Sequence, residues 1–461
     1  MTPAVSSVAV IGAGWAGCAA AVRLASLGYQ VTLLEATRTA GGRARRVEQQ
    51  GLALDNGQHI LLGAYRDTLN LMHTVGIRPD DALLRLPLQM RYPPDSGGMD
   101  FLAPHLPAPL HMAWALWRAT GLSAQDKLAL ARFFSAARWM DWRLEVDCSA
   151  SQLLERFEQT ERVVNLLWRP LCLAALNTPP ERASAAIFLH VLRDSLGARR
   201  AASDMLLPRV DLSALLPDAA MRYLQKQGGQ SQTGVHVRGI RKKNQQWQVH
   251  ADAYCADFDA VIVATPPWVA ATLLHDHDPT LSTLPLTYES ITTCYLRYLP
   301  TVALPRPFYA LQDAVQHNQW GQFVFDRGQL HTAQAGLLAV VISASAQAHA
   351  LGADALLDAV ATQLATVFQR DELRQPLWRQ CITEKRATFA CTPGLHRPAN
   401  TTACARLWIA GDYTASDYPA TLESAVQSGL EAARLLSSAD AALFYVGRRA
   451  DRLNSPRLPL V

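Results

Sequence analysis

Three closely spaced glycines near the amino terminus constrain the fold of this chain more than any other feature. The apolar run 8–11 leads into Gly12, Gly14 and Gly17, and residues 18–27 follow at helical spacing. Gly12 permits a tight turn, Gly14 lets the backbone approach a pyrophosphate, and Gly17 allows the helix to pack closely on the strand. The first amides of that helix would face the phosphates. The spacing therefore predicts the strand, turn and helix of a dinucleotide-binding fold.

An acidic residue completes this fingerprint. Glu35 lies 18 residues after Gly17, at the end of a predicted strand in which Val31 and Leu33 point inward. A carboxylate here can accept hydrogen bonds from the hydroxyls of an adenosine ribose, and it disfavours a 2′-phosphate. Glycine turns also occur in ordinary strand-to-helix connections, so it is the strand, the helix and the distal acid together that favour a dinucleotide site.

Length, charge and cysteine content narrow the class of protein. A chain of 461 residues is too long for one compact core, and two intertwined domains fit best. The 43 Lys and Arg residues nearly balance the 39 Asp and Glu residues, so charge gives no argument for nucleic-acid binding. The eight cysteines include no C-x-x-C pair, which argues against a disulfide framework and against a metal site. A reduced, cytoplasmic protein is expected, and no apolar run is long enough to span a bilayer.

Two loops after Glu35 contain polar groups that could bind a cofactor. Gly42 allows an unusual backbone angle, and the Arg43 guanidinium can meet phosphate oxygens. A solvated basic loop is the alternative interpretation. Residues 55–59 form a polar turn before an apolar run, which indicates a loop at a strand end near the cofactor. His59 in this turn is either a packed, hydrogen-bonded histidine or a catalytic one.

Residues 103–196 are predicted to be helical and rich in aromatic side chains. The segment 110–121 carries Trp114 and Trp117 at i and i+3. It is either a buried helix or an interfacial one, because Trp beside Arg118 suits a membrane boundary. The apolar run 168–180 could line a cavity or pack in the core.

The remaining segments predict further strands and helices, which belong to the two expected domains. They are a helix over 208–227, meander strands near 235–240, 247–251 and 254, a buried strand over 258–264, an antiparallel sheet between 291 and 345, and a helix over 354–368. Near the carboxyl terminus, an apolar strand ends in Gly411 and Asp412, and a helix starts near Thr421. A carboxylate at such a strand end can bind a ribityl hydroxyl, and a helix N-terminus stabilises negative charge on a reduced flavin.

Together these motifs resemble the FAD-dependent amine-oxidase and carotenoid-desaturase superfamily, and the resemblance covers essentially the whole chain. It implies an α/β fold in which a Rossmann-like FAD-binding domain of the GR2 type is intertwined with an α+β substrate domain. The expected FAD-binding domain comprises 1–75, 205–285 and 400–440, the substrate-binding domain comprises 76–204 and 286–399, and 441–461 form a C-terminal tail. The resemblance implies FAD contacts from Gly12, Gly14, Gly17, Glu35, Gly42, Arg43, Val237, Gly411, Asp412, Thr421 and Leu422, with Val237 reaching the adenine through its backbone.

Three segments resemble the squalene-associated branch of this superfamily, the hydroxysqualene dehydroxylases. They are residues 55–65, 171–179 and 411–425. The resemblance implies reductive loss of the allylic hydroxyl of hydroxysqualene, which gives squalene for hopanoid synthesis, with an external electron donor of unknown identity. Hydroxide is a poor leaving group, so an acid must protonate it, and His59 is the candidate because it titrates in a useful range. A lipid substrate also suggests peripheral contact with the inner face of the cytoplasmic membrane.

Two departures separate the chain from the other branches. No lysine near the flavin and no aromatic cage can be placed, although amine oxidases usually have both. Gly57 is followed by Gln and His where carotenoid desaturases usually have Gly-Pro. A desaturase or an amine oxidase with another substrate is one alternative. A non-catalytic prenyl-lipid carrier, like the GDP-dissociation inhibitors, is the other, and the Gly12 fingerprint with the Gly411–Asp412 strand argues against it.

Overall fold

A five-stranded parallel sheet forms one part of the molecule in the computed structural model, which describes residues 5–453 and the side chains of residues 5–440. Its strands lie in the order β10 (Gln230–Thr233), β2 (Gln30–Glu35), β1 (Ser7–Ile11), β14 (Ala260–Val263) and β20 (Leu407–Ile409). Every neighbouring pair runs parallel. The first strand of the chain is therefore central, and distant segments complete the sheet, as the predicted Rossmann-like fold requires.

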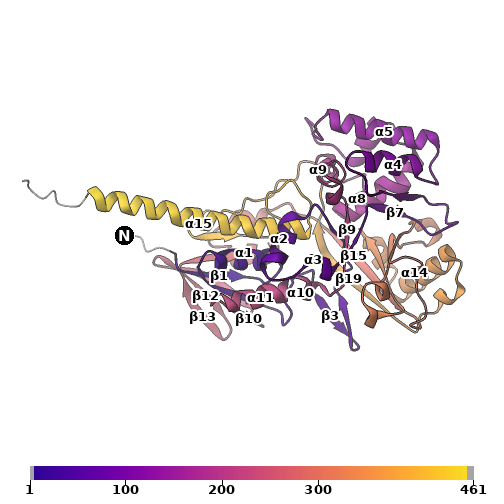
Figure 1. Ribbon diagram of the computed structural model, residues 1–461. Helices are drawn as coiled ribbons and strands as arrows, with labels where there is room; N and C mark the ends of the chain where they lie inside the picture. The colour runs from indigo at the N-terminus through magenta and orange to yellow at the C-terminus, as the bar shows by residue number, and fades with distance from the viewer. Residues whose placement is uncertain (1–4, 454–461) are drawn as a thin grey trace, which may run out of the picture.

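The two faces of this sheet are covered differently. One face carries α1 (Trp15–Ser26), α11 (Pro217–Lys226) and α15 (Leu422–Leu453), as Figure 1 shows. The other carries the antiparallel meander of β11 (Val237–Lys243), β12 (Gln246–Ala251) and β13 (Tyr254–Phe258). Side chains alternate along a strand, so Val8 and Val10 join the helical cluster while Ala9 and Ile11 join the meander cluster. The sheet is thus buried on both faces, which is typical of parallel sheets.

Helix α15 packs closely on α1. A Cβ added to Gly429 would lie 2.1 Å from the carbonyl oxygen of Ala16, so this contact needs a glycine. The tail predicted over 441–461 begins inside α15, which continues to Leu453, and residues 454–461 lie outside the described residues.

A second sheet, which is antiparallel, forms the core of the other part. Its order is β16 (Phe308–Ala310), β17 (Phe323–Asp326), β18 (Leu337–Ser343), β15 (Tyr288–Arg297) and β19 (Trp378–Phe389). Helix α14 (Ala353–Phe368) covers one face. The first four strands and α14 confirm the prediction. Strand β19 was not predicted, and it is the longest strand of this sheet.

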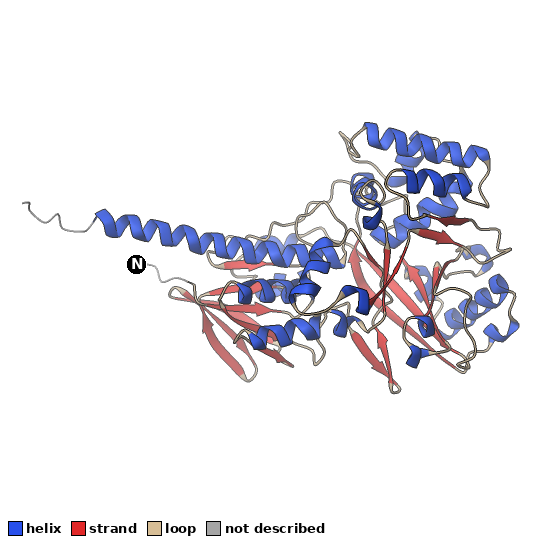
Figure 2. Ribbon diagram, in the orientation of Figure 1, coloured by secondary structure: helices blue, strands red, loops and turns tan. Residues whose placement is uncertain are grey.

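A helical group packs beside this sheet, at the end of the molecule away from the parallel sheet (Figure 2). Its helices are α4 (Leu110–Arg118), α5 (Ala124–Trp139), α6 (Ala150–Arg156), α7 (Glu161–Val163), α8 (Arg169–Leu176) and α9 (Ala185–Ser195), with a π-helical turn over Val164–Trp168. Trp168, Phe133 and Phe188 are fully buried between these helices. The helical and aromatic pattern of 103–196 is thereby confirmed.

The remaining α-helices and strands are short. They are β3 (Arg46–Gln49), β4 (Leu52–Asp55), β5 (Leu61–Leu62), α2 (Arg66–Thr74), α3 (Pro79–Ala82), β6 (Leu83–Leu86), β7 (Gln89–Arg91), β8 (Asp100–Leu102), β9 (Met205–Pro208), α10 (Leu212–Leu215), α12 (Pro267–Leu273) and α13 (Ala346–Ala350). The helix predicted over 208–227 is wrong at its start, because Pro208 ends a strand and α10 begins at Leu212. Pro217 then opens a separate helix, α11, since proline cannot continue α10. Within the described residues, no helix combines the length and the hydropathy needed to cross a membrane.

Candidate functional site

One cavity brings together almost every residue that the sequence predicts for the site. Its volume is about 500 Å³, and its walls come from both the parallel and the antiparallel sheet. The predicted residues that line it are Gly12, Gly14, Glu35, Gly42, Arg43, His59, Val237, Gly411, Asp412, Thr421 and Leu422. Gly17 does not line it. A Cβ on Gly17 would lie 1.8 Å from the carbonyl oxygen of Gly12, so this glycine serves the packing of α1.

The glycine turn leaves open space at Gly14. Gly12 has a φ of +105°, and its Cβ would meet the carbonyl oxygen of Ala264 at 2.5 Å, so the fold itself requires this glycine. Gly14 has an ordinary φ of −71°, and the nearest atom to its Cβ would be the Cα of Gly42, 3.9 Å away. No described residue beyond the chain neighbours of Gly14 excludes a side chain there. A glycine here is explained by a ligand that lies against the backbone, as the dinucleotide motif predicts.

The Glu35 carboxylate is fixed in the wall of the cavity. One oxygen accepts a hydrogen bond from the amide of Ala13 at 2.8 Å. The other accepts from the amide of Thr37 at 2.9 Å and from its hydroxyl at 2.8 Å. A carboxylate offers about four acceptor positions. One position is therefore left for a ligand hydroxyl, and the carboxylate is already oriented to use it.

Arg43 and Asp412 form an ion pair that the sequence did not predict. Their closest atoms, Nη2 and Oδ1, are 2.6 Å apart, and Asp412 is buried. Arg43 also donates from Nη1 to the carbonyl oxygen of Ala387 in β19, at 2.8 Å. The guanidinium thus connects the end of β20 to the antiparallel sheet, and both predicted cofactor contacts lie at one point of the cavity.

Two buried hydroxyls in the cavity wall have no hydrogen-bond partner among the described residues. They are Thr265 Oγ1 and the Tyr413 hydroxyl. A buried hydroxyl without a partner costs about 1–3 kcal/mol, so such groups are expected to meet a ligand. Both follow the carboxyl ends of parallel strands, where ligands bind in α/β folds, and that position is the signal by which the sequence could have revealed them. With the space at Gly14, these hydroxyls show that the residues present fit a bound dinucleotide.

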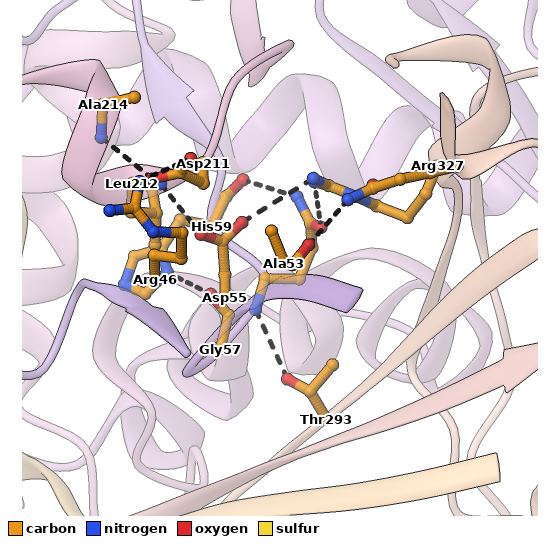
Figure 3. Close-up of polar contacts among 12 residues, drawn as sticks. Arg46, Ala53, Asp55, Gly57, His59, Asp211, Leu212, Ala214, Thr293 and Arg327 are labelled. Atoms are coloured by element: carbon orange, nitrogen blue, oxygen red, sulfur yellow. Dashed lines mark hydrogen bonds and ion pairs between the residues drawn. The ribbon is translucent and has the colours of Figure 1, made fainter. Parts of the chain in front are cut away.

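The loop formed by residues 56–60, here called the His59 loop, is held by a buried arginine (Figure 3). Arg327 is 3% exposed and donates to the side-chain oxygens of Gln58 and Gln334, at 2.8 Å each. Its Nη2 atom lies 3.7 Å from Oδ2 of Asp55, the residue that precedes the loop. Burial raises the pKa of Asp55 to about 6, although the charge of Arg327 opposes the rise. No motif in the sequence marks Arg327 as part of the site.

His59 has a defined tautomer when its ring is neutral. Its Nδ1 atom lies 2.7 Å from the carbonyl oxygen of Gly57, and a carbonyl only accepts, so Nδ1 carries a proton. Burial lowers the pKa of His59 below its ordinary value, and the nearby charge of Arg43 lowers it further, against the hydrogen bond to Gly57. The neutral ring therefore presents Nε2 as an acceptor, and only the protonated ring could donate from that atom.

Apolar side chains line another part of the cavity, beside the polar Ser343, Glu384 and Thr388. Ile291, Phe323, Phe325 and Val341 contribute from the antiparallel sheet. The run 168–180 both lines the cavity and packs in the core, the two roles that its sequence allowed. Its cavity-lining residues are Ala174, Ala175 and Asn177, and its buried core residues include Trp168, Cys172 and Leu173. A polar end beside the glycine turn and an apolar end are typical of a site for a cofactor and a hydrophobic substrate.

Comparisons with known proteins agree with this geometry. Hydroxysqualene dehydroxylase of Rhodopseudomonas palustris is 32% identical over 457 residues, covering 94% of this chain and 99% of that protein. The protein of the same name from Sinorhizobium fredii is 30% identical over 461 residues, covering 94% and 98%. An oxidoreductase structure from Methanosarcina mazei shares the fold with a TM-score of 0.71 at 16% identity, covering 92% of this chain and 99% of that one.

A family model described as flavin containing amine oxidoreductase matches residues 15–437. This span includes the antiparallel sheet, every strand of the parallel sheet except β1, the helical group and most of the cavity wall. The chain therefore belongs to the flavin containing amine oxidoreductases and is an FAD-dependent oxidoreductase.

Proposed function

We propose that this enzyme reduces hydroxysqualene to squalene with loss of the allylic hydroxyl, in squalene and hopanoid biosynthesis. The observation that carries the proposal is the similarity, over nearly the whole length of both chains, to proteins named hydroxysqualene dehydroxylase. The apolar wall of the cavity supports it, because a thirty-carbon isoprenoid offers almost only hydrocarbon surface.

The predicted contacts give each part of the cavity a role. Glu35 would hold the ribose of FAD, the turn at Gly14 would hold its pyrophosphate, and Arg43 with Asp412 would contact its phosphate and ribityl groups. When bound, reduced FAD supplies a hydride to the allylic carbon as the carbon–oxygen bond breaks. The apolar wall would orient the hydrocarbon and exclude water from the carbon that becomes electron-poor.

A single-turnover experiment tests the reaction. Photoreduced protein incubated anaerobically with hydroxysqualene is expected to yield about one squalene per flavin, because one two-electron reduction consumes one reduced cofactor. Oxidised protein under the same conditions should yield none, and extraction followed by chromatography measures both. If oxidised protein instead converts squalene to a more unsaturated product, the desaturase alternative is correct. A purified protein that stays colourless after addition of FAD would favour the lipid carrier.

His59 is proposed to protonate the departing hydroxyl. Because its pKa is lowered below 6.5, the protonated form decreases as pH rises through that lowered value. The single-turnover rate is therefore expected to fall over the same range, and His59→Gln should lower the rate ~100-fold or more, as loss of a general acid does. His275→Gln, a change at an exposed ring, is the matched control. If the rate of His59→Gln depends on pH as the wild-type rate does, His59 is not the general acid.

Helix α4 is proposed to contact the membrane surface from which the substrate enters. Leu110, Trp114 and Trp117 are 57%, 44% and 68% exposed, so the buried-helix interpretation is wrong for this face. The two indole rings contact each other edge to face, with centroids 5.2 Å apart. His111 and Ala115, on the other face, are buried. Exposed Trp on a helix whose other face is anchored supports an interfacial role.

Liposome flotation tests this contact. The double variant Trp114→Ser with Trp117→Ser is expected to lose most flotation, because binding should come from apolar burial at roughly 25 cal/mol per Å². Wild-type flotation should resist added salt, since screening weakens exposed charge attraction but not apolar burial. Trp268→Ser, at a residue outside α4, is the control. Equal flotation of wild type and a folded double variant would exclude α4 as the contact.

A further inference from the structure

Two free cysteines lie directly opposite each other in the antiparallel sheet. Cys294 of β15 is the register partner of Cys381 of β19. Directly opposite residues of an antiparallel pair have Cα atoms about 4.5–5.5 Å apart. Disulfides span Cα separations of about 4.4–6.8 Å. The backbone therefore already has the spacing that a disulfide between these residues needs.

The two side chains also point to the same side of the sheet. Cys294 belongs to the buried cluster under α14, and Cys381 packs against that same cluster. The neighbouring register pair, Thr293 and Ile382, points to the opposite face. Formation of the bond therefore requires no change of register and no turn of either strand.

The two thiols differ in solvent exposure and in pKa. Cys294 is fully buried, whereas Cys381 is only partly buried because β19 is the edge strand. A hydrogen bond from Cys294 lowers the pKa of Cys381 below its ordinary value, against the effect of burial. The same interaction, together with burial, raises the pKa of Cys294. Cys381 is thus the thiol that solvent reaches and that ionises more readily than Cys294.

We propose that Cys294 and Cys381 form a reversible cross-strand disulfide when the protein meets a small-molecule disulfide such as oxidised glutathione. The Cys381 thiolate attacks one sulfur of the oxidant, and the first glutathione leaves as a thiolate. Cys294 then loses its proton and attacks the Cys381 sulfur, which releases the second glutathione. Two electrons from the protein thiols reduce one glutathione disulfide to two thiols.

This bond would join two strands that hold the cavity wall. On β15, Thr293 Oγ1 accepts from the amide of Gln58 in the His59 loop, at 3.4 Å. On β19, Glu384 accepts from Asn56 of the same loop, at 3.1 Å. The disulfide would join the same two strands on their opposite face, the face that packs on α14. The redox state of the pair would therefore fix the separation of the strands that position the loop. The two thiols can form this bond whichever substrate the enzyme reduces.

Peptide mapping of the FAD-bound full chain tests the proposal. The protein is incubated with excess oxidised glutathione at neutral pH, denatured with an alkylating reagent, and digested without reduction by trypsin and a glutamate-specific protease. This digestion yields Cys294 in residues 290–297, apart from Cys381 in 380–384 and from the exposed Cys255. Mass spectrometry should find the first two peptides joined, two hydrogen atoms lighter than their sum, and separated by dithiothreitol.

Matched variants identify the order of the steps. Cys294→Ser should stop at a glutathione adduct on Cys381, and Cys381→Ser should leave Cys294 unmodified. Cys391→Ser should still give the joined peptides, because Cys391 is buried and its pKa is raised to about 12. Retained flavin absorbance shows that each protein stays folded. The proposal is overturned if Cys255 carries glutathione while Cys294 and Cys381 are both alkylated, or if wild type stops at separate adducts.

Discussion

Replacing Gly14 by valine is expected to weaken FAD binding by ~100-fold or more while leaving the ligand-free fold intact. The backbone of Gly14 has an ordinary φ, and apart from its chain neighbours the nearest described atom to an added Cβ would be the Cα of Gly42, 3.9 Å away. The two methyl groups of valine would instead fill the space predicted for the pyrophosphate. An overpacking cost of about 3 kcal/mol corresponds to ~100-fold weaker binding. Flavin absorbance after reconstitution and titration calorimetry with FAD measure the loss.

Two further glycine variants show whether the effect belongs to the ligand. Gly14→Ala adds one methyl group to the same space and should weaken FAD binding less than valine does. Gly17→Ala should instead lower the thermal stability of the ligand-free protein, because its Cβ would lie 1.8 Å from the carbonyl oxygen of Gly12. The pyrophosphate must lie elsewhere if Gly14→Val binds FAD as tightly as wild type.

The parts of the fold that the sequence predicted are those specified by neighbouring residues. The glycine turn, the strand before it and Glu35 lie within one short segment, and β1, β2, β14 and β20 of the parallel sheet are compact, mostly apolar runs, whereas β10 is polar. Burial on both faces produces such runs, which are visible without knowledge of the partner strands. The start of α15 was predicted for the same reason, because Gly411, Asp412 and Thr421 are close in sequence.

The features of the site that the sequence did not predict depend on contacts between residues that are far apart in the sequence. Arg327 and Gln58 are 269 residues apart, and Arg43 and Asp412 are 369 apart, so no local pattern marks either pair. An arginine in a predicted sheet region is ordinarily a solvent-exposed residue, whereas Arg327 is buried.

Strand β19 was missed for a different reason. It is an edge strand paired only with β15, and its middle carries Thr383, Glu384, Lys385 and Arg386. Charged residues are common on edge strands, where they prevent pairing with other chains. The same residues suppress the apolar alternation by which strands are predicted.

Replacing Arg327 by methionine is expected to lower the free energy of unfolding by ~3–5 kcal/mol, the effect of removing one partner of a buried ion pair. The change leaves Asp55, which is 2% exposed, without its nearest cation, and Gln58 and Gln334 lose a donor. Chemical denaturation measures the loss. Arg379→Met, which breaks an ion pair with the exposed side chain of Asp358, is the control and should cost at most about 1 kcal/mol.

The pH dependence distinguishes a lost ion pair from lost packing. The pKa of Asp55 is raised from 3.8 to about 6 in the folded protein, so between these values the folded state binds more protons than the unfolded state. This group therefore favours folding below pH 3.8, and its contribution is lost as pH rises to about 6. Without the Arg327 charge the pKa of Asp55 rises further, so Arg327→Met should continue to lose stability above that value, where wild type no longer does. Adding Asp55→Asn should remove this extra loss and recover part of the stability, because no uncompensated carboxylate is then buried. A loss in Arg327→Met that is independent of pH, and that Asp55→Asn does not relieve, would mean that Arg327 acts through packing alone.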